Sequence, residues 1–206
     1  YGAHRDLHSF PTRRSSDLPG WYPEDIARFG HRAAGPYSGM KGALTEAGHR
    51  VPFIARWPGR IGAGATCGAL VCFTDLMATL AAVTGAPMPA GAGEDSLDLS
   101  PLLRGETPAR PIRERLVHVN YGSYTLAIRE GDWKLILPEW VYAVKDGTIS
   151  PDRVVEVPGR GPRPGFQLYN LAADPGEAGN LAARHPERVA ALFESLRDVL
   201  REGGKR

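Results

Sequence analysis

The end of the chain has the pattern of an amphipathic helix. Such a helix is stable only when its apolar face packs against another surface of the protein. Apolar residues recur three or four positions apart on one predicted helix face: Val189, Leu192, Phe193, Leu196, Val199 and Leu200. Pro186 suits the first turn of this helix, and Gly203-Gly204 ends it. Burying such a face contributes on the order of 1.5–3 kcal/mol for each large side chain. The residues before it must therefore build an apolar surface.

These preceding residues are predicted to form a small antiparallel sheet. The strand candidates are Leu116–Tyr121, Tyr124–Arg129, Trp133–Leu137 and Phe166–Leu171. Glycine in Glu130-Gly131-Asp132 favours a tight hairpin turn, and the stretch between Trp140 and Pro164 is typical of a surface hairpin or loop. Strands followed by one long helix indicate an α+β unit, which we assign to residues 101–206.

Residues 19–100 have the patterns of an α/β unit. Val51–Ala55 and Ala69–Phe73 are apolar on both faces, as the inner strands of a helix-covered sheet are. Thr74 is placed to cap a following helix, with Asp75 in its first turn, an apolar face at Leu76, Leu80 and Val83, and Gly85 at its end. Ser100 is placed to cap a short helix that begins with Pro101.

Composition narrows the function classes. The chain has 206 residues, of which 42% are hydrophobic and 23% charged, and its net charge is +2. No basic cluster alternates with aromatic residues, so nucleic acid is not expected as a partner. No apolar run approaches the ~18 residues of a membrane span. Cys67 and Cys72 match no zinc or redox spacing, so we expect buried, apolar-like side chains.

The candidate site lies in the segment from Gly35 to Pro58. Glycines flank Lys41 in Gly39-Met40-Lys41-Gly42, which allows a tight turn to present the lysine from a loop. Glu46 and Arg50 are four positions apart, which suits an ion pair across one helical turn, worth ~0.3–0.5 kcal/mol if exposed and ended by Gly48 in the left-handed conformation. We expect this pair to position the loop and not to contact substrate. His31 is a second candidate, since an imidazole can donate to an anionic group near neutral pH.

The ordered series Gly-Pro-x-x-Gly-x-Lys-Gly, Glu-x-Gly-x-Arg-Val-Pro-Phe-Ile and Trp-Pro-Gly resembles the late catalytic-domain signature of arylsulfatase-type sulfatases, in the alkaline-phosphatase superfamily. The resemblance continues to Leu181. It implies the end of an alkaline-phosphatase-like sheet domain (19–100) followed by a small α+β domain (101–206). It also implies that Lys41 contacts the sulfate group and that His31 is a weaker substrate-binding candidate. His118 and Asn120 lie on a strand that can line a substrate pocket in this family, although a surface position is the simpler expectation for His118.

The sequence departs from the family in ways that bear on activity. The formylglycine nucleophile and the Asp-Asn pair that completes the calcium site have no counterpart, so we expect calcium and formylglycine only in a full-length parent, and no metal site here. Tyr1–Leu18 resembles a translated sequencing adapter, and we exclude it. Its Ser9-Phe10-Pro11-Thr12-Arg13 matches Cys/Ser-x-Pro-x-Arg but lies only 32 positions (41−9) before Lys41, so we treat it as a decoy.

The resulting expectation is an inactive carboxyl-terminal fragment of a bacterial-type sulfuric ester hydrolase. Its parent would act on a small-molecule or glycan sulfate ester, and the family implies a periplasmic or secreted location. Two alternatives stay open. One is a fragment of a phosphodiesterase or phosphonate monoester hydrolase of the same superfamily. The other is a pseudoenzyme or interaction module without catalysis. The oligomeric state does not follow from the sequence.

Overall fold

The computed structural model describes residues 28–30, 32, 34–120, 125–138, 141–145, 148–155 and 165–203. Tyr1–Leu18, with the Ser9–Arg13 motif, and the candidate His31 lie outside them. Internal contacts divide the chain into two units, each described by itself below. The first combines the described residues up to Pro52 with those from Val117 onward, and the second is Phe53–Leu116. The domain boundary predicted near residue 100 concerns a longer protein and stays a prediction.

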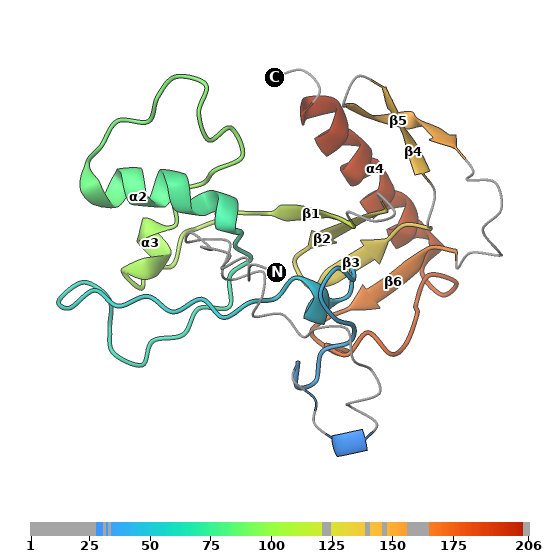
Figure 1. Cartoon of the computed structure of the whole chain (residues 1–206), viewed down its shortest axis with the longest axis horizontal. Coiled ribbons are helices and arrows are strands. Elements are labelled where there is room, and N and C mark those ends of the chain that lie inside the picture. Colours follow the sequence, from blue (N-terminus) through green and yellow to red (C-terminus); the bar gives the residue numbers. More distant parts are fainter. Residues whose placement is uncertain are drawn as a thin grey trace, which may run out of the picture. The chain divides into compact units, whose positions relative to one another are not determined.

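The first unit is built on a four-stranded sheet (Figure 1). Its strands are β1 (Arg115–Val119), β2 (Leu126–Glu130), β3 (Trp133–Ile136) and β6 (Gln167–Asn170), in the order β1-β2-β3-β6. β3 pairs antiparallel with both β2 and β6. Gly131 has φ +53° in the β2–β3 turn, where a positive φ favours glycine. All four predicted strands of this sheet are therefore confirmed.

The two faces of this sheet have different partners. Helix α4 (Pro186–Gly203) places Leu192 and Leu196 in one apolar cluster with alternate residues of the strands: Leu126, Ile128, Leu135, Leu137 and Leu168. The intervening residues point to the other face, where Ala127, Ile136, Tyr169 and Leu171 cluster with Leu44. The predicted helix and its apolar face are thus confirmed. The segment around Leu44 covers the face opposite the helix.

A separate hairpin precedes β6. Strands β4 (Val141–Lys145) and β5 (Thr148–Val155) pair antiparallel as a two-stranded sheet, with a register shift between Tyr142 and Val144. This agrees with the surface hairpin predicted for the stretch after Trp140. The fold class is accordingly confirmed as α/β, with an antiparallel sheet followed by a carboxyl-terminal helix in the last part of the chain.

The second unit contains the predicted helices but neither predicted strand. A 3₁₀ turn η3 (Phe73–Asp75) leads into α2 (Leu76–Thr84), and α3 (Ser100–Leu103) follows. Gly85 ends α2 with φ +70°, as predicted. Val51–Ala55 and Ala69–Phe73 are not strands, and Ile54 is 87% exposed. An apolar segment becomes a strand only when its backbone pairs with another strand, and neither segment belongs to a sheet of the described residues.

Capping in the second unit also differs from the sequence prediction. Asp75, not Thr74, accepts hydrogen bonds from the backbone N–H groups of Cys72 (2.9 Å) and Leu97 (3.1 Å). Its buried carboxylate also pairs with Arg113. Asp75 is therefore a structural residue, because backbone groups and one guanidinium satisfy its oxygens.

Three smaller expectations for the second unit were wrong. Ser100 is the first residue of α3 and not its cap, and its side chain bonds to Asp98. Cys67 is exposed and Cys72 half-buried, so neither is the buried residue expected. On α2, Leu80 of the predicted apolar face is 57% exposed.

None of the described helices is long and apolar enough to cross a lipid bilayer.

Candidate functional site

Lys41 lies at the corner of a tight turn and its side chain is exposed. The turn is closed by a hydrogen bond from the Ala43 N–H to the Met40 carbonyl oxygen (2.9 Å). Gly42 has φ +90°, which the third position of a type II turn requires. The turn therefore presents the lysine ammonium to its surroundings, as predicted from the flanking glycines.

Close packing fixes the backbone on both sides of this turn. Gly39 has φ +90°, and a Cβ there would lie 2.0 Å from Thr45 Oγ1. At Gly48 a Cβ would lie 2.0 Å from the Ala43 carbonyl oxygen. Gly48 was predicted to adopt the left-handed conformation, which is wrong, because φ is not positive there. The glycine is needed for close approach instead.

Residues from the sheet hold the lysine turn from outside it. The Asn120 side chain donates from Nδ2 to the Gly42 carbonyl oxygen (2.5 Å), directly after Lys41. Leu44 packs into the apolar cluster with Ala127 and Ile136 on the sheet. The Ala47 N–H donates to the Ser38 carbonyl oxygen (3.0 Å), which closes the loop on itself. The position of Lys41 thus depends on contacts with residues about 80 positions further along the chain.

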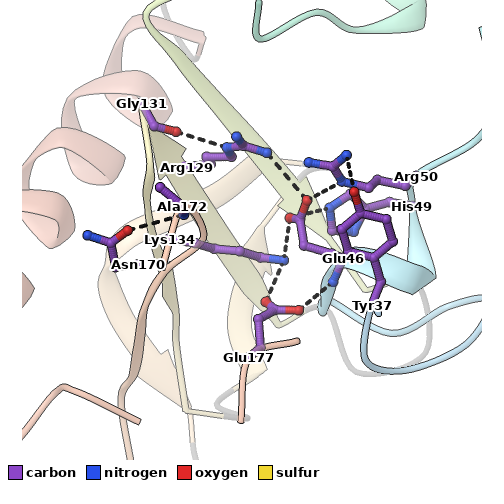
Figure 2. Close-up of polar contacts among 10 residues, drawn as sticks. All are labelled: Tyr37, Glu46, His49, Arg50, Arg129, Gly131, Lys134, Asn170, Ala172 and Glu177. Carbon is purple, nitrogen blue, oxygen red and sulfur yellow. Dashed lines mark hydrogen bonds and ion pairs between the residues drawn. The ribbon is translucent and has the colours of Figure 1, made fainter. Parts of the chain in front are cut away.

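A buried group of charges lies beneath the loop (Figure 2). Glu46, in the 3₁₀ turn η2 (Glu46–Gly48), is only 1% exposed. Its carboxylate accepts from Arg50 Nε (2.5 Å), Arg129 Nη1 (3.3 Å) and Lys134 Nζ (3.1 Å), and His49 Nε2 lies at 3.3 Å. Lys134, which is fully buried, also forms an ion pair with Glu177 Oε1 (2.9 Å). We call these six residues, Glu46, His49, Arg50, Arg129, Lys134 and Glu177, the Glu46 cluster.

The sheet register explains why the cluster needs an acid from the loop. Arg129 and Lys134 are directly opposite each other on β2 and β3. Like charges across a strand pair repel, and they are costly to bury without an opposite charge. The Glu46 carboxylate contacts both, and this contact places the loop on the polar part of the sheet face.

The protonation of Glu46 follows from these contacts. Burial alone would raise the pKa of its carboxyl. Hydrogen bonds from His49 and Arg50 and the positive charge of Lys134 outweigh burial and hold that pKa far below its usual value. Glu46 is therefore ionised at every physiological pH. The predicted Glu46–Arg50 ion pair is present, with the glutamate side buried and the Arg50 side chain 44% exposed.

Glu177 contributes a second carboxylate from the turn after β6. Its Oε2 accepts a hydrogen bond from the backbone N–H of Glu46 (2.6 Å), 131 positions away in sequence. Glu177 has φ +52°, and it is the only non-glycine with positive φ among the described residues. A left-handed backbone costs a residue with a Cβ roughly 1–2 kcal/mol, so its contacts must offset this strain.

The two histidines near the cluster stack on each other. The ring centroids of His49 and His118 are 4.0 Å apart. Burial, the neighbouring His49 and the charge of Lys134 lower the pKa of His118 to about 3. His118 is half-buried and in ring contact with His49, so it is not the freely exposed surface histidine that was expected. Its imidazole is neutral and packs beneath the loop.

The structure thus places one of the two predicted site residues. Lys41 is exposed on its turn, whereas His31 lies outside the described residues and stays a prediction. Sequence reasoning missed the supporting residues Arg129, Lys134 and Glu177. A signal was present for one of them, because Lys134 interrupts an otherwise apolar strand, Trp133-Lys134-Leu135-Ile136.

Among the residues that the structure describes, no group of three or more His, Cys, Asp or Glu side chains is arranged to hold a metal ion. The calcium expected in a longer parent stays a prediction.

The known proteins that are similar to this chain are sulfatases. No protein-family model matches the chain. It is 39% identical over 173 residues to the N-acetylgalactosamine-6-O-sulfatase of Bacteroides thetaiotaomicron, covering 82% of this chain and 31% of that protein. It is 36% identical over 159 residues to human arylsulfatase A, covering 74% of this chain and 31% of that protein.

Solved structures agree with the curated relatives. A Bacteroides thetaiotaomicron protein, described under the metabolism of multiple glycosaminoglycans, superposes with a TM-score of 0.65 at 33% identity, covering 86% of this chain and 35% of that one. A sulfatase from Pseudoalteromonas sp. superposes at 0.57 with 23% identity, covering 80% of this chain and 32% of that one, and it supports the fold alone. The chain spans about a third of the length of the relatives it matches.

Proposed function

Because the chain belongs to the sulfatase family, we propose that it is the carboxyl-terminal part of an arylsulfatase-type sulfuric ester hydrolase in which Lys41 contacts the sulfate group. One observation carries this proposal. Lys41 is exposed at the corner of a turn that Asn120 and the Leu44 cluster hold after the lysine, and the Ala47–Ser38 backbone hydrogen bond holds before it. A cation on a fixed backbone can meet charge that develops in a transition state without first reorganising.

The chemistry of sulfate ester hydrolysis suits this role. As the ester bond breaks, negative charge builds on the sulfuryl oxygens and on the leaving oxygen. The lysine ammonium is a compact donor with three N–H groups, and it can contact oxygens on either side of the breaking bond. Lys41 would stabilise this charge, but it supplies no nucleophile. We therefore propose that the 206-residue chain by itself does not turn over sulfate esters.

The longer enzyme would supply what these residues lack. We expect a formylglycine residue, which would supply the nucleophile, and a calcium ion, which would supply positive charge, to be provided by other parts of the longer enzyme. The relatives include an N-acetylgalactosamine-6-O-sulfatase, so a glycan sulfate ester is the substrate class that we propose for the longer enzyme. A periplasmic or secreted location remains the expectation for it.

The proposal is tested by replacing Lys41 with Ala in the longer enzyme. Loss of one fixed donor to a developing oxyanion typically lowers kcat by about 10²–10³. We expect a loss of this size with an aryl sulfate, and little change for Arg60→Ala, which removes an exposed cation in the second unit. Unchanged kcat in Lys41→Ala would refute the catalytic role of the lysine.

The same assay separates the two remaining alternatives. An aryl phosphodiester and an aryl phosphonate monoester are measured beside the aryl sulfate. A preference for either phosphorus substrate would favour the phosphodiesterase or phosphonate hydrolase reading. Absence of turnover with all three would favour a pseudoenzyme.

A further inference from the structure

We propose that Lys134 and Glu177 are positioning residues for Lys41, because together they fix the backbone of the loop that carries it. This inference rests on the proposed function, since it assigns two more residues to the same site. Neither residue is near the lysine in sequence, and neither contacts the lysine turn itself.

The geometry gives each residue a separate task. Lys134 Nζ lies between two carboxylates, 3.1 Å from Glu46 Oε1 and 2.9 Å from Glu177 Oε1. Glu177 uses its other oxygen, Oε2, to accept the backbone N–H of Glu46 at 2.6 Å. Lys134 therefore holds the loop through a side chain, and Glu177 holds it through the main chain. Both contacts are buried, so water cannot replace them.

A short path leads from this contact to the lysine. Glu46 begins the turn η2, and the next residue, Ala47, donates its N–H to the Ser38 carbonyl oxygen (3.0 Å). Ser38 lies three positions before Lys41, and Ala47 lies six positions after it. A displacement of Glu46 would therefore move both ends of the lysine turn together.

The backbone of Glu177 is a second, independent observation. Glycine would adopt φ +52° without strain, yet this position carries glutamate. If Glu177 served only the turn after β6, Glu177→Gly would relieve the strain and leave the loop unchanged. If it positions the loop, the same change removes the acceptor of the Glu46 N–H. The two roles predict opposite results from one substitution.

The first experiment measures amide hydrogen exchange in the full 206-residue chain. In Glu177→Gly we expect the Ala47 amide to exchange about tenfold faster or more, which corresponds to ~1.4 kcal/mol. The Leu137 amide, bonded to the Leu126 carbonyl oxygen within the sheet, should stay protected and report that the unit is folded. Glu106→Gly, which removes an exposed carboxylate in the other unit, should change neither amide. Unchanged exchange at Ala47 in Glu177→Gly would overturn the proposal.

A milder variant covers the case in which Glu177→Gly unfolds the sheet as well. Glu177→Gln keeps the shape and an acceptor oxygen but loses the charge that pairs with Lys134. Faster exchange at Ala47 with Leu137 still protected would support a positioning role. Equal effects on both amides would overturn it, and no effect on either would show that the ion pair with Lys134 does not contribute to positioning.

The second experiment asks whether Glu177 acts through Lys41. In the longer enzyme, kcat for an aryl sulfate is compared among Lys41→Ala, Glu177→Gly and the double variant. A positioning residue loses its effect once the lysine is gone, so the double variant should equal Lys41→Ala. Independent, multiplying effects would overturn this inference and leave the proposed function intact. Normal turnover in Lys41→Ala alone would instead refute the proposed function.

Discussion

Replacing Lys134 with Met tests how much the Glu46 cluster contributes to stability. Methionine keeps the apolar stem but removes the ammonium that lies between two buried carboxylates. Breaking a buried ion pair from one side costs about 3–5 kcal/mol. Glu46 keeps its contacts with Arg50 and Arg129, whereas Glu177 loses its only cation among the described residues and keeps one backbone donor. We therefore expect the lower end of this range, about 3 kcal/mol.

The assay is urea unfolding followed by far-ultraviolet circular dichroism, to which α4 contributes as the longest helix of the described chain. With a slope of ~2 kcal/mol per molar, a loss of ~3 kcal/mol lowers the midpoint by about 1.5 M. Arg104→Met is the matched control, because it breaks an ion pair with Glu106 that is exposed on both sides, and it should cost under about 1 kcal/mol. The double variant Lys134→Met, Glu177→Gln also removes the unpaired carboxylate charge of Glu177, and it should recover part of the lost free energy of unfolding. A midpoint shift for Lys134→Met no larger than that of Arg104→Met would refute the reasoning.

Three further changes probe the histidine pair, the core and the loop. Burial lowers the pKa of His118 to about 3, from the ordinary histidine value of about 6.5. The unfolded chain therefore binds a proton that the folded chain does not, and the free energy of unfolding should fall by ~1.4 kcal/mol per pH unit below about pH 6.5. His118→Gln should flatten this slope between pH 6.5 and 4.5, and an equal slope in both proteins would contradict it. Leu196→Ala should cost ~2–5 kcal/mol in urea unfolding, against under ~1 kcal/mol for the exposed Leu80→Ala, and similar costs would argue against the assigned core. Gly48→Ala places a Cβ 2.0 Å from a backbone oxygen and should cost ~1–3 kcal/mol, whereas Gly68→Ala, with open space around it, should be near neutral by thermal unfolding.

The elements that sequence predicted well are those whose partners are close in the chain. The hairpin at Gly131 joins adjacent strands, and α4 carries its own period and its own start and stop signals. Val51–Ala55 failed for the opposite reason. Its apolar pattern describes what such a segment does beside neighbouring strands, and pattern alone does not supply them.

The candidate site likewise has one part that the local sequence predicts and one part that it does not. The turn at Lys41 was predictable because glycine at position 42 specifies it locally. The partners of Glu46 were not, because Lys134 and Glu177 lie 88 and 131 positions away. Local reasoning found only the partner four residues on, Arg50. Only the sheet register shows that two cations on adjacent strands share its carboxylate.

The hydrogen bond between Glu177 and the Glu46 backbone has a consequence for the order of events during synthesis. At a translation rate of about 5–20 residues per second, the ribosome needs about 7–26 s to add the 131 residues between them. Throughout this interval the nascent chain carries Lys41 on a loop that lacks its final support. A nascent chain that stops after β3 but before Glu177 would contain the lysine turn and Lys134, yet its loop would lack one of its two buried carboxylates. The support of this loop is therefore completed only after the turn that follows β6 has left the ribosome.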